Sequence, residues 1–165
     1  MSDWRLSLQF FILIFRLVWG SKRAFKNDSD LLCASSIYGD NDSVNTVAII
    51  GASNDRNKFG NKAVRAYLRQ GYTVYPVNLN QTSIEGIPAY KTIRDVPTRP
   101  ERVSVYLPPP VLLHILPDIA ATGCDELWLN PGTESKEVLA EADRLGLNVI
   151  QACSIVDIGQ TPGLL

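Results

Sequence analysis

The sequence predicts an α/β protein with a Rossmann-like, doubly wound sheet of five to six mostly parallel strands and helices on both faces. Two observations predict this fold class. After Val44, short β-branched runs alternate with amphipathic stretches of helical length, a pattern that is typical of βαβ units with right-handed crossovers. The chain has 165 residues, of which 45% are hydrophobic and 20% charged, and these values suit about one globular domain.

The first half of the predicted domain contains two strands and a helix. Thr46–Gly51 is a continuous apolar run rich in β-branched residues, which is typical of a strand buried on both faces. Phe59–Gln70 follows a helical period. Its expected inward positions are Ala63, Val64, Tyr67 and Leu68. Tyr72–Val77 is the second strand, because turn-forming asparagines follow it. We expect a short edge strand within 84–90 and a helical turn at 92–96.

The second half of the predicted domain repeats the alternation. Arg102–Leu107 is a strand, and the prolines after it suit the first turn of a helix over Val111–Ala121. Glu126–Leu129 is a short apolar strand. Glu134–Leu145 is a helix that a glycine ends, and Leu147–Gln151 is the last strand.

Residues 1–43 differ in character from the rest and are assigned to an N-terminal extension, with the domain over 44–165. Leu6–Trp19 is an apolar run of 14 residues, shorter than the ~20 that cross a bilayer. Segment 27–43 is rich in Asp, Ser and Asn and is interpreted as a linker. Three interpretations stay open: translated upstream sequence before a natural start near Val44, which we favour, a membrane-associated tail, or a signal sequence.

The composition argues against several classes of function. The net charge is −1, so no basic field favours nucleic acid. The chain has one histidine, His114, and three widely spaced cysteines at positions 33, 124 and 153. We therefore predict no metal site, no catalytic triad and no disulfide framework. A cytoplasmic location is expected, without membrane association unless 1–43 is a genuine tail; the oligomeric state stays open.

The first predicted βα loop, Gly51–Gly60, has the setting of a phosphate-binding site. In doubly wound sheets, ligands bind beyond the carboxyl ends of the strands. This loop leaves a buried strand and opens a helix, whose N-terminal N–H groups attract anions. It matches neither the dinucleotide fingerprint nor the P-loop. Arg56 and Lys58 could add charge-assisted contacts to a diphosphate.

The loop after the second strand argues against NAD. NAD-binding domains usually place a carboxylate there to hold the ribose hydroxyls, whereas this chain has Pro76, Val77 and Asn78. Asn78 could still bond a ribose or an adenine.

Two further loops follow the third and fourth strands of the main sheet. The segment 106–110 carries three consecutive prolines, which either form a stiff apolar wall for a ligand or simply start the next helix. The segment 130–133 offers backbone amides, and Thr133 is expected to cap the following helix.

Together these loops resemble the small bacterial CoA-binding domain proteins and the N-terminal domain of the succinyl-CoA synthetase alpha subunit. The resemblance spans nearly all of 44–158. The segments that carry it are 47–53, 71–78, 86–90, 106–109, 126–130 and 149–153. Two positions depart from the family pattern: Leu107 stands where an arginine is frequent, and Ser154 stands where a proline often follows the last-strand cysteine.

The loops and the resemblance together imply a set of residues around the ligand. These residues are Gly51, Ala52, Ser53, Asn54, Arg56, Lys58, Gly60, Pro76, Val77, Asn78, Tyr106, Leu107, Pro108, Pro109, Asn130 and Gly132. The resemblance implies a domain that binds coenzyme A or an acyl-CoA, and we find no catalytic residues, so we interpret it as a binding module. Two alternatives stay open: a small NAD(P)-binding oxidoreductase or redox sensor, and a noncatalytic subunit of a split acyl-CoA ligase.

Overall fold

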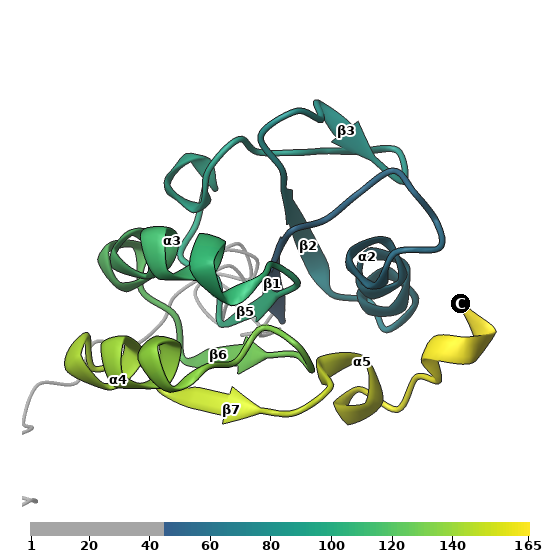
Figure 1. Cartoon of the computed structure of the whole chain (residues 1–165). Coiled ribbons are helices and arrows are strands. Elements are labelled where there is room, and N and C mark those ends of the chain that lie inside the picture. Colours follow the sequence, from purple (N-terminus) through teal and green to yellow (C-terminus); the bar gives the residue numbers. More distant parts are fainter. Residues whose placement is uncertain (1–44) are drawn as a thin grey trace, which may run out of the picture. The chain divides into compact units, whose positions relative to one another are not determined.

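The computed structural model describes residues 45–165, and the expectations for residues 1–43 lie outside the described residues. The core is a five-stranded parallel sheet in the order β2-β1-β5-β6-β7 (Figure 1). The strands are β1 (Thr46–Ile50), β2 (Thr73–Val77), β5 (Arg102–Val105), β6 (Glu126–Leu129) and β7 (Val149–Gln151). The prediction of a doubly wound parallel sheet is confirmed.

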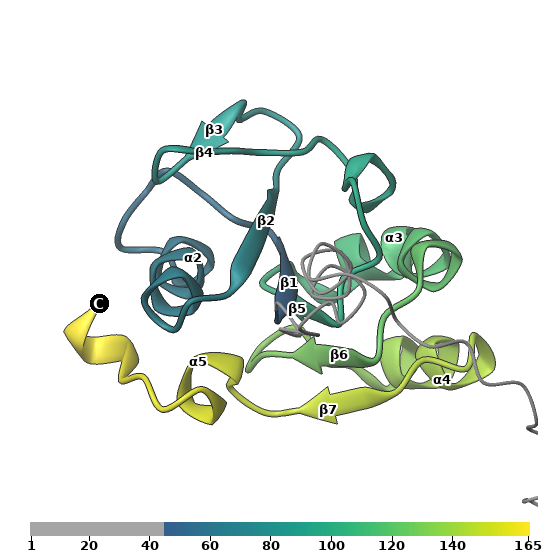
Figure 2. The ribbon, with the colours of Figure 1, turned by 180° about the vertical axis from the view of Figure 1, so that it is seen from behind.

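Helices cover both faces of this sheet (Figures 1 and 2). Figure 2 shows α2 (Phe59–Arg69) and the short α5 (Ser154–Asp157) on one side, and α3 (Pro109–Thr122) and α4 (Lys136–Arg144) on the other. Successive strand residues point to opposite faces. Along β1, Val47 and Ile49 therefore pack with α2, whereas Ala48 and Ile50 pack with α3.

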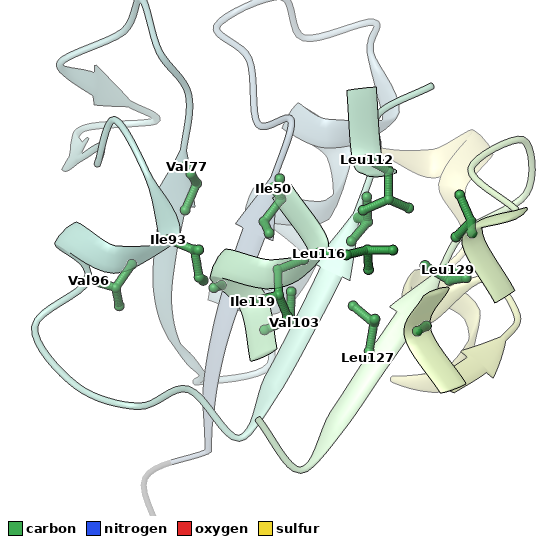
Figure 3. Packing of buried hydrophobic residues seen from close by; sticks show 14 residues of the cluster. Ile50, Val77, Ile93, Val96, Val103, Leu112, Leu116, Ile119, Leu127 and Leu129 are labelled. Carbon is green, nitrogen blue, oxygen red and sulfur yellow. The ribbon is translucent and has the colours of Figure 1, made fainter. Parts of the chain in front are cut away.

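The larger of the two apolar layers lies under α3 and α4 (Figure 3). Leu112, Leu116 and Ile119 lie on one face of α3, at the helical spacing of three to four residues, and are fully buried. They belong to one cluster with the apolar residues of β5 and β6 and with Ile93, which lies beside Ile119 in Figure 3. The described part of the chain thus has a packed apolar layer on each face of the sheet.

The elements between β2 and β5 match the sequence-based expectations in part. The segment 84–90 joins the main sheet only by a bridge between Val77 and Tyr90, and otherwise forms a separate hairpin of β3 (Ser83–Ile84) and β4 (Ile87–Pro88). The predicted turn at 92–96 is confirmed as the 3-10 helix η2 (Ile93–Asp95).

Two helical elements near the C-terminus were not predicted: α5 and the 3-10 helix η3 (Pro162–Leu164). Thr133 does not cap α4, because the Ser135 side chain accepts the N–H of Val138 instead. None of the helices within residues 45–165 is long and apolar enough to span a bilayer.

Candidate ligand-binding site at the carboxyl edge of the sheet

The strand order places a crevice beside β1. The chain passes from β1 to β2 on one side and then crosses to β5 on the other, so the loops that follow β1 and β5 diverge at their shared edge. Here the N–H of Gly51 donates to the Val77 carbonyl (3.1 Å) and that of Tyr106 donates to the Ile50 carbonyl (2.8 Å). The ends of β2, β1 and β5 are therefore held side by side.

Two glycines allow close backbone contacts at this edge. Gly51 has φ 85°, and a Cβ there would lie 2.8 Å from the carbonyl oxygen of Tyr106. A Cβ on Gly60 would lie 2.2 Å from the carbonyl oxygen of Gly51. Side chains at either position would force the backbones apart. Gly60 is the second residue of α2, so the N-terminus of this helix sits directly against the end of β1.

The first turn of α2 offers free hydrogen-bond donors. Lys58 is the N-cap residue, and its side chain makes no cap hydrogen bond. Within residues 45–165, the N–H groups of Phe59 and Gly60 have no hydrogen-bond acceptor. Such N–H groups, together with the helix dipole, favour an anion at a helix N-terminus.

Two cavities lie at this edge of the sheet, and Gly51 and Leu107 line both of them. Cavity A has a volume of about 240 Å³ and lies between the end of β2, η2 and α3. Its lining residues are Ile50, Gly51, Val77, Asn78, Leu79, Asn80, Lys91, Thr92, Ile93, Leu107, Val111, Ile115 and Asp118. Cavity B has a volume of about 470 Å³. It is lined by Gly51, Lys58, Phe59, Gly60, Tyr106, Leu107, Pro108, Asn130, Pro131, Gly132, Thr133 and Cys153.

Cavity A is largely apolar, with polar groups at its rim. The side-chain amide of Asn78 donates to the Ala52 carbonyl (2.7 Å), and its oxygen accepts the N–H of Asn80 (2.8 Å). Asn78 thus ties the loop after β2 to the loop after β1. Asp118 forms an ion pair with Arg94 (2.7 Å). A narrow apolar space with a few fixed polar groups suits a planar, weakly polar ring.

Cavity B rests on a buried polar network. Asn130 donates to the Ser104 hydroxyl and to the Val105 carbonyl (both 2.9 Å), and its Oδ1 accepts the N–H of Ser154 (2.9 Å). The Tyr106 hydroxyl lies 3.1 Å from Ser154 Oγ. Burial raises the pKa of Tyr106, with the nearby serine hydroxyls acting in the opposite direction. These polar atoms form hydrogen bonds with one another and stabilise the base of the cavity.

The cations around the first loop differ in their surroundings. Lys58 lines cavity B and makes no ion pair within residues 45–165. Arg56 lines neither cavity and instead forms an ion pair with Glu85 in the β3–β4 hairpin (3.1 Å). Of the two cations expected near a phosphate, the structure therefore brings Lys58 to the cavity.

The fourth loop contains an anion contact within the chain. The carboxylate of Glu134 accepts the N–H of Gly132 (2.8 Å). Hydrogen bonds from the backbone N–H groups of Glu134 itself, Gly132 and Thr133 hold the pKa of the Glu134 carboxyl below its usual range. The Gly132 N–H, which was expected to face a ligand, thus already donates to a carboxylate of the protein.

The predicted site residues fall into two groups. Those that line a cavity are Gly51, Lys58, Gly60, Val77, Asn78, Tyr106, Leu107, Pro108, Asn130 and Gly132. Those that line neither are Ala52, Ser53, Asn54, Arg56, Pro76 and Pro109. Ala52 is fully buried, and Asn54 bonds to the Ser83 carbonyl (3.0 Å).

Several cavity residues were missed by the sequence-based set. In cavity A these include Lys91 and Thr92, which directly precede η2, and Val111 and Ile115 of α3. No local motif marks them, because they reach the site only through packing of α3 and η2 against the sheet. Cys153 was expected near the carboxyl end of the last strand but was left out of the predicted set, and it lines cavity B.

The described part of the chain contains no cluster of three or more His, Cys, Asp or Glu side chains that could hold a metal ion. Its two cysteines, Cys124 and Cys153, are both free and half-buried. Burial raises the pKa of the Cys124 thiol from 9.0 to about 11.

Comparisons with known proteins identify the family of the chain. A family model described as the CoA binding domain matches residues 45–159. The alpha subunit of an ADP-forming acetate–CoA ligase II from Pyrococcus furiosus is 29% identical over 117 residues, and the alignment covers 63% of this chain and 25% of that subunit. The chain therefore spans about a quarter of the length of this curated relative.

Solved structures share the fold. A conserved hypothetical protein from Pyrococcus furiosus has a TM-score of 0.63 and 30% identity, and the alignment covers 68% of this chain and 97% of that one. A Thermus thermophilus protein has a TM-score of 0.64 and 27% identity, with coverage of 80% and 96%. From the family match over 45–159 and these likenesses, we conclude that the chain belongs to the CoA binding domain family.

Proposed function

We propose that this protein binds coenzyme A or an acyl-CoA across cavities A and B, as a binding module. One observation carries the proposal: two cavities of different character meet at Gly51 and Leu107, beside the free N–H groups of α2. CoA has three matching parts, namely an adenine nucleotide, a diphosphate and a long pantetheine arm.

Each part has a compartment that suits it. The apolar cavity A suits the adenine, with Asn78 and Asn80 at its rim. The diphosphate fits at Gly51, where it can accept the N–H groups of Phe59 and Gly60 and an ion-pair contact from Lys58. The larger cavity B suits the pantetheine arm, and Cys153 lies in its lining.

The NAD alternative receives less support from the geometry. The side chain of Asn78 occupies the position after β2 where a ribose-binding carboxylate is usual. Both polar ends of that side chain already bond to the protein, at Ala52 and Asn80. A ribose would have to compete with these contacts.

The split-ligase alternative rests on a different observation. The matching relative from Pyrococcus furiosus is named as the alpha subunit of an acetate–CoA ligase, and this chain corresponds to 25% of it. If this chain serves such a ligase, other polypeptides must supply the remaining parts. Purification of the tagged protein from its native host, followed by mass spectrometry, would then recover a partner in fixed stoichiometry that carries an ATP-binding domain. Recovery of this chain alone would argue against that role.

Thermal denaturation of the full chain tests the binding proposal. With CoA at about 100 times its dissociation constant, ligand binding should add ~2.7 kcal/mol to the free energy of unfolding, and NAD at equal concentration should add less. Lys58→Ala should weaken CoA binding about tenfold or more, because a charge-assisted contact is lost. Arg69→Ala is the matched control, since Arg69 lies at the other end of α2. Stabilisation by NAD alone would refute the proposal.

A further inference from the structure

The loop between β1 and α2 has no regular structure, but three side chains from outside it and one of its own side chains hold it in place. The carbonyl of Ser53 accepts an N–H of the Asn61 side chain (2.8 Å). The carbonyl of Arg56 accepts one from Arg65 (2.9 Å). Asn78 and Asn54 add the contacts to Ala52 and to the β3–β4 hairpin described above. The loop is therefore tied to α2 on one side and to neighbouring loops on the other.

Asn61 and Glu85 lie at the centre of these ties. Asn61 is fully buried; besides its bond to Ser53 it donates to Glu85 Oε1 (2.9 Å), and its Oδ1 accepts the Arg65 Nε–H (2.8 Å). The other carboxylate oxygen of Glu85 accepts from Arg56 (3.1 Å). One carboxylate thus contacts both the first turn of α2 and the loop.

Glu85 is an unfavourable residue for its own turn. It and Gly86 connect β3 to β4, with φ 49° and 80°, as in a two-residue hairpin loop that favours Asn or Gly at both positions. Within residues 45–165, Glu85 is the one non-glycine residue with positive φ. The preceding Ile84 is fully buried in the α2-side apolar layer, and this packing brings the Glu85 side chain against the loop.

We infer that Glu85 is a positioning residue: through Asn61 and Arg56 it holds the β1–α2 loop in the shape that the ligand requires. The ion pair also keeps Arg56 away from both cavities, so that Lys58 is the loop cation beside the ligand. The ligand part of this inference rests on the proposed binding of CoA. The holding of the loop does not depend on that ligand.

Two substitutions distinguish the effect of the Glu85 carboxylate contacts from the effect of the positive φ at this residue. Glu85→Gly removes both contacts and relieves the positive φ, so a role confined to the turn would leave the loop unchanged or make the protein more stable. Glu85→Gln keeps an acceptor for Asn61 but removes the charge opposite Arg56. Glu141→Ala is the control, because this carboxylate pairs with Arg144 within α4 (2.7 Å), away from the loop.

The first measurement is amide hydrogen exchange of the ligand-free full chain by NMR, read at Asp55, Asn57 and Lys58. In Glu85→Gly the exchange of these amides should rise about tenfold, as expected for losing a hydrogen bond to a charged group. The rise should be smaller in Glu85→Gln and absent in Glu141→Ala. Unchanged exchange in Glu85→Gly, or an equal rise at the Tyr106 amide in the sheet, would overturn the inference.

The second measurement is CoA affinity by calorimetry on the same proteins. Glu85→Gly should bind CoA about tenfold more weakly, and Glu85→Gln should recover part of this loss. Wild-type affinity in Glu85→Gly, with a freed loop, would overturn the ligand part alone. Failure of the wild-type protein to bind CoA would refute the proposed function, and the exchange data would still decide whether Glu85 holds the loop.

Discussion

Replacement of Gly60 by alanine tests the close contact between α2 and β1. The new Cβ would lie 2.2 Å from the Gly51 carbonyl oxygen, and ordinary contacts begin at 3.4 Å. The two backbone segments must therefore separate by at least 0.8 Å, because Cβ contacts below 3.0 Å essentially do not occur. Overpacking of a core costs ~1–3 kcal/mol, and the better helix propensity of alanine offsets at most ~1 kcal/mol of this. We expect the free energy of unfolding to fall by about 1–2 kcal/mol.

The same shift should weaken the binding of the ligand. It moves the N–H groups of Phe59 and Gly60 away from Gly51, so CoA affinity should fall about tenfold or more. Urea denaturation measures the first effect, and calorimetry below the unfolding transition measures the second. Gly163→Ala is the control, because nothing lies within 4 Å of its new Cβ. Wild-type stability together with wild-type CoA affinity in Gly60→Ala would show that the close contact between α2 and β1 constrains neither folding nor binding.

Two further predictions concern Asn78 and the cysteines. Asn78→Ala removes the hydrogen bond to the Ala52 carbonyl (2.7 Å). It should lower the free energy of unfolding by about 1–2 kcal/mol and weaken the binding of CoA. Asn148→Ala, which loses a bond to the Asp125 carbonyl (2.9 Å) at the opposite edge of the sheet, should leave CoA affinity unchanged; equal effects on affinity would contradict this account. Alkylation followed by peptide mapping should show that CoA protects Cys153, which lines cavity B. The thiol of Cys124 should react slowly at pH 8 and faster toward pH 11, because the thiolate is the nucleophile and the pKa of this thiol is raised to about 11. Labelling of Cys153 that CoA does not slow would contradict the position of Cys153 beside the ligand.

The alternation of hydrophobic periods was sufficient to predict the main sheet. Glu126–Leu129 has the predicted bounds, and the other main strands differ at their ends by one or two residues. This agreement has a physical cause: parallel strands buried on both faces need continuous apolar runs, which the sequence displays directly. The α5 turn was missed, because a helix of four residues carries too little periodicity to detect.

The candidate site was less accessible to sequence reasoning. Loops that follow strands could be assigned to the carboxyl edge by a topological rule, which is why Gly51, Lys58 and Leu107 were predicted at this edge, where each lines a cavity. The same rule cannot tell which loop side chains turn toward the protein. Arg56 was expected at a phosphate, yet it pairs with Glu85, a residue 29 positions away. Contacts of this kind depend on tertiary packing and leave no local pattern.

An NMR titration of the full chain with CoA, with NAD as the comparison, locates the ligand directly. We expect saturable chemical-shift changes at the amides of Gly51, Phe59, Gly60 and Leu107, where the two cavities meet. We expect little change at Thr46, at the opposite end of β1. Absence of shifts at high CoA concentration, shifts located elsewhere, or equal shifts with NAD would contradict the proposal that this carboxyl edge is a CoA site.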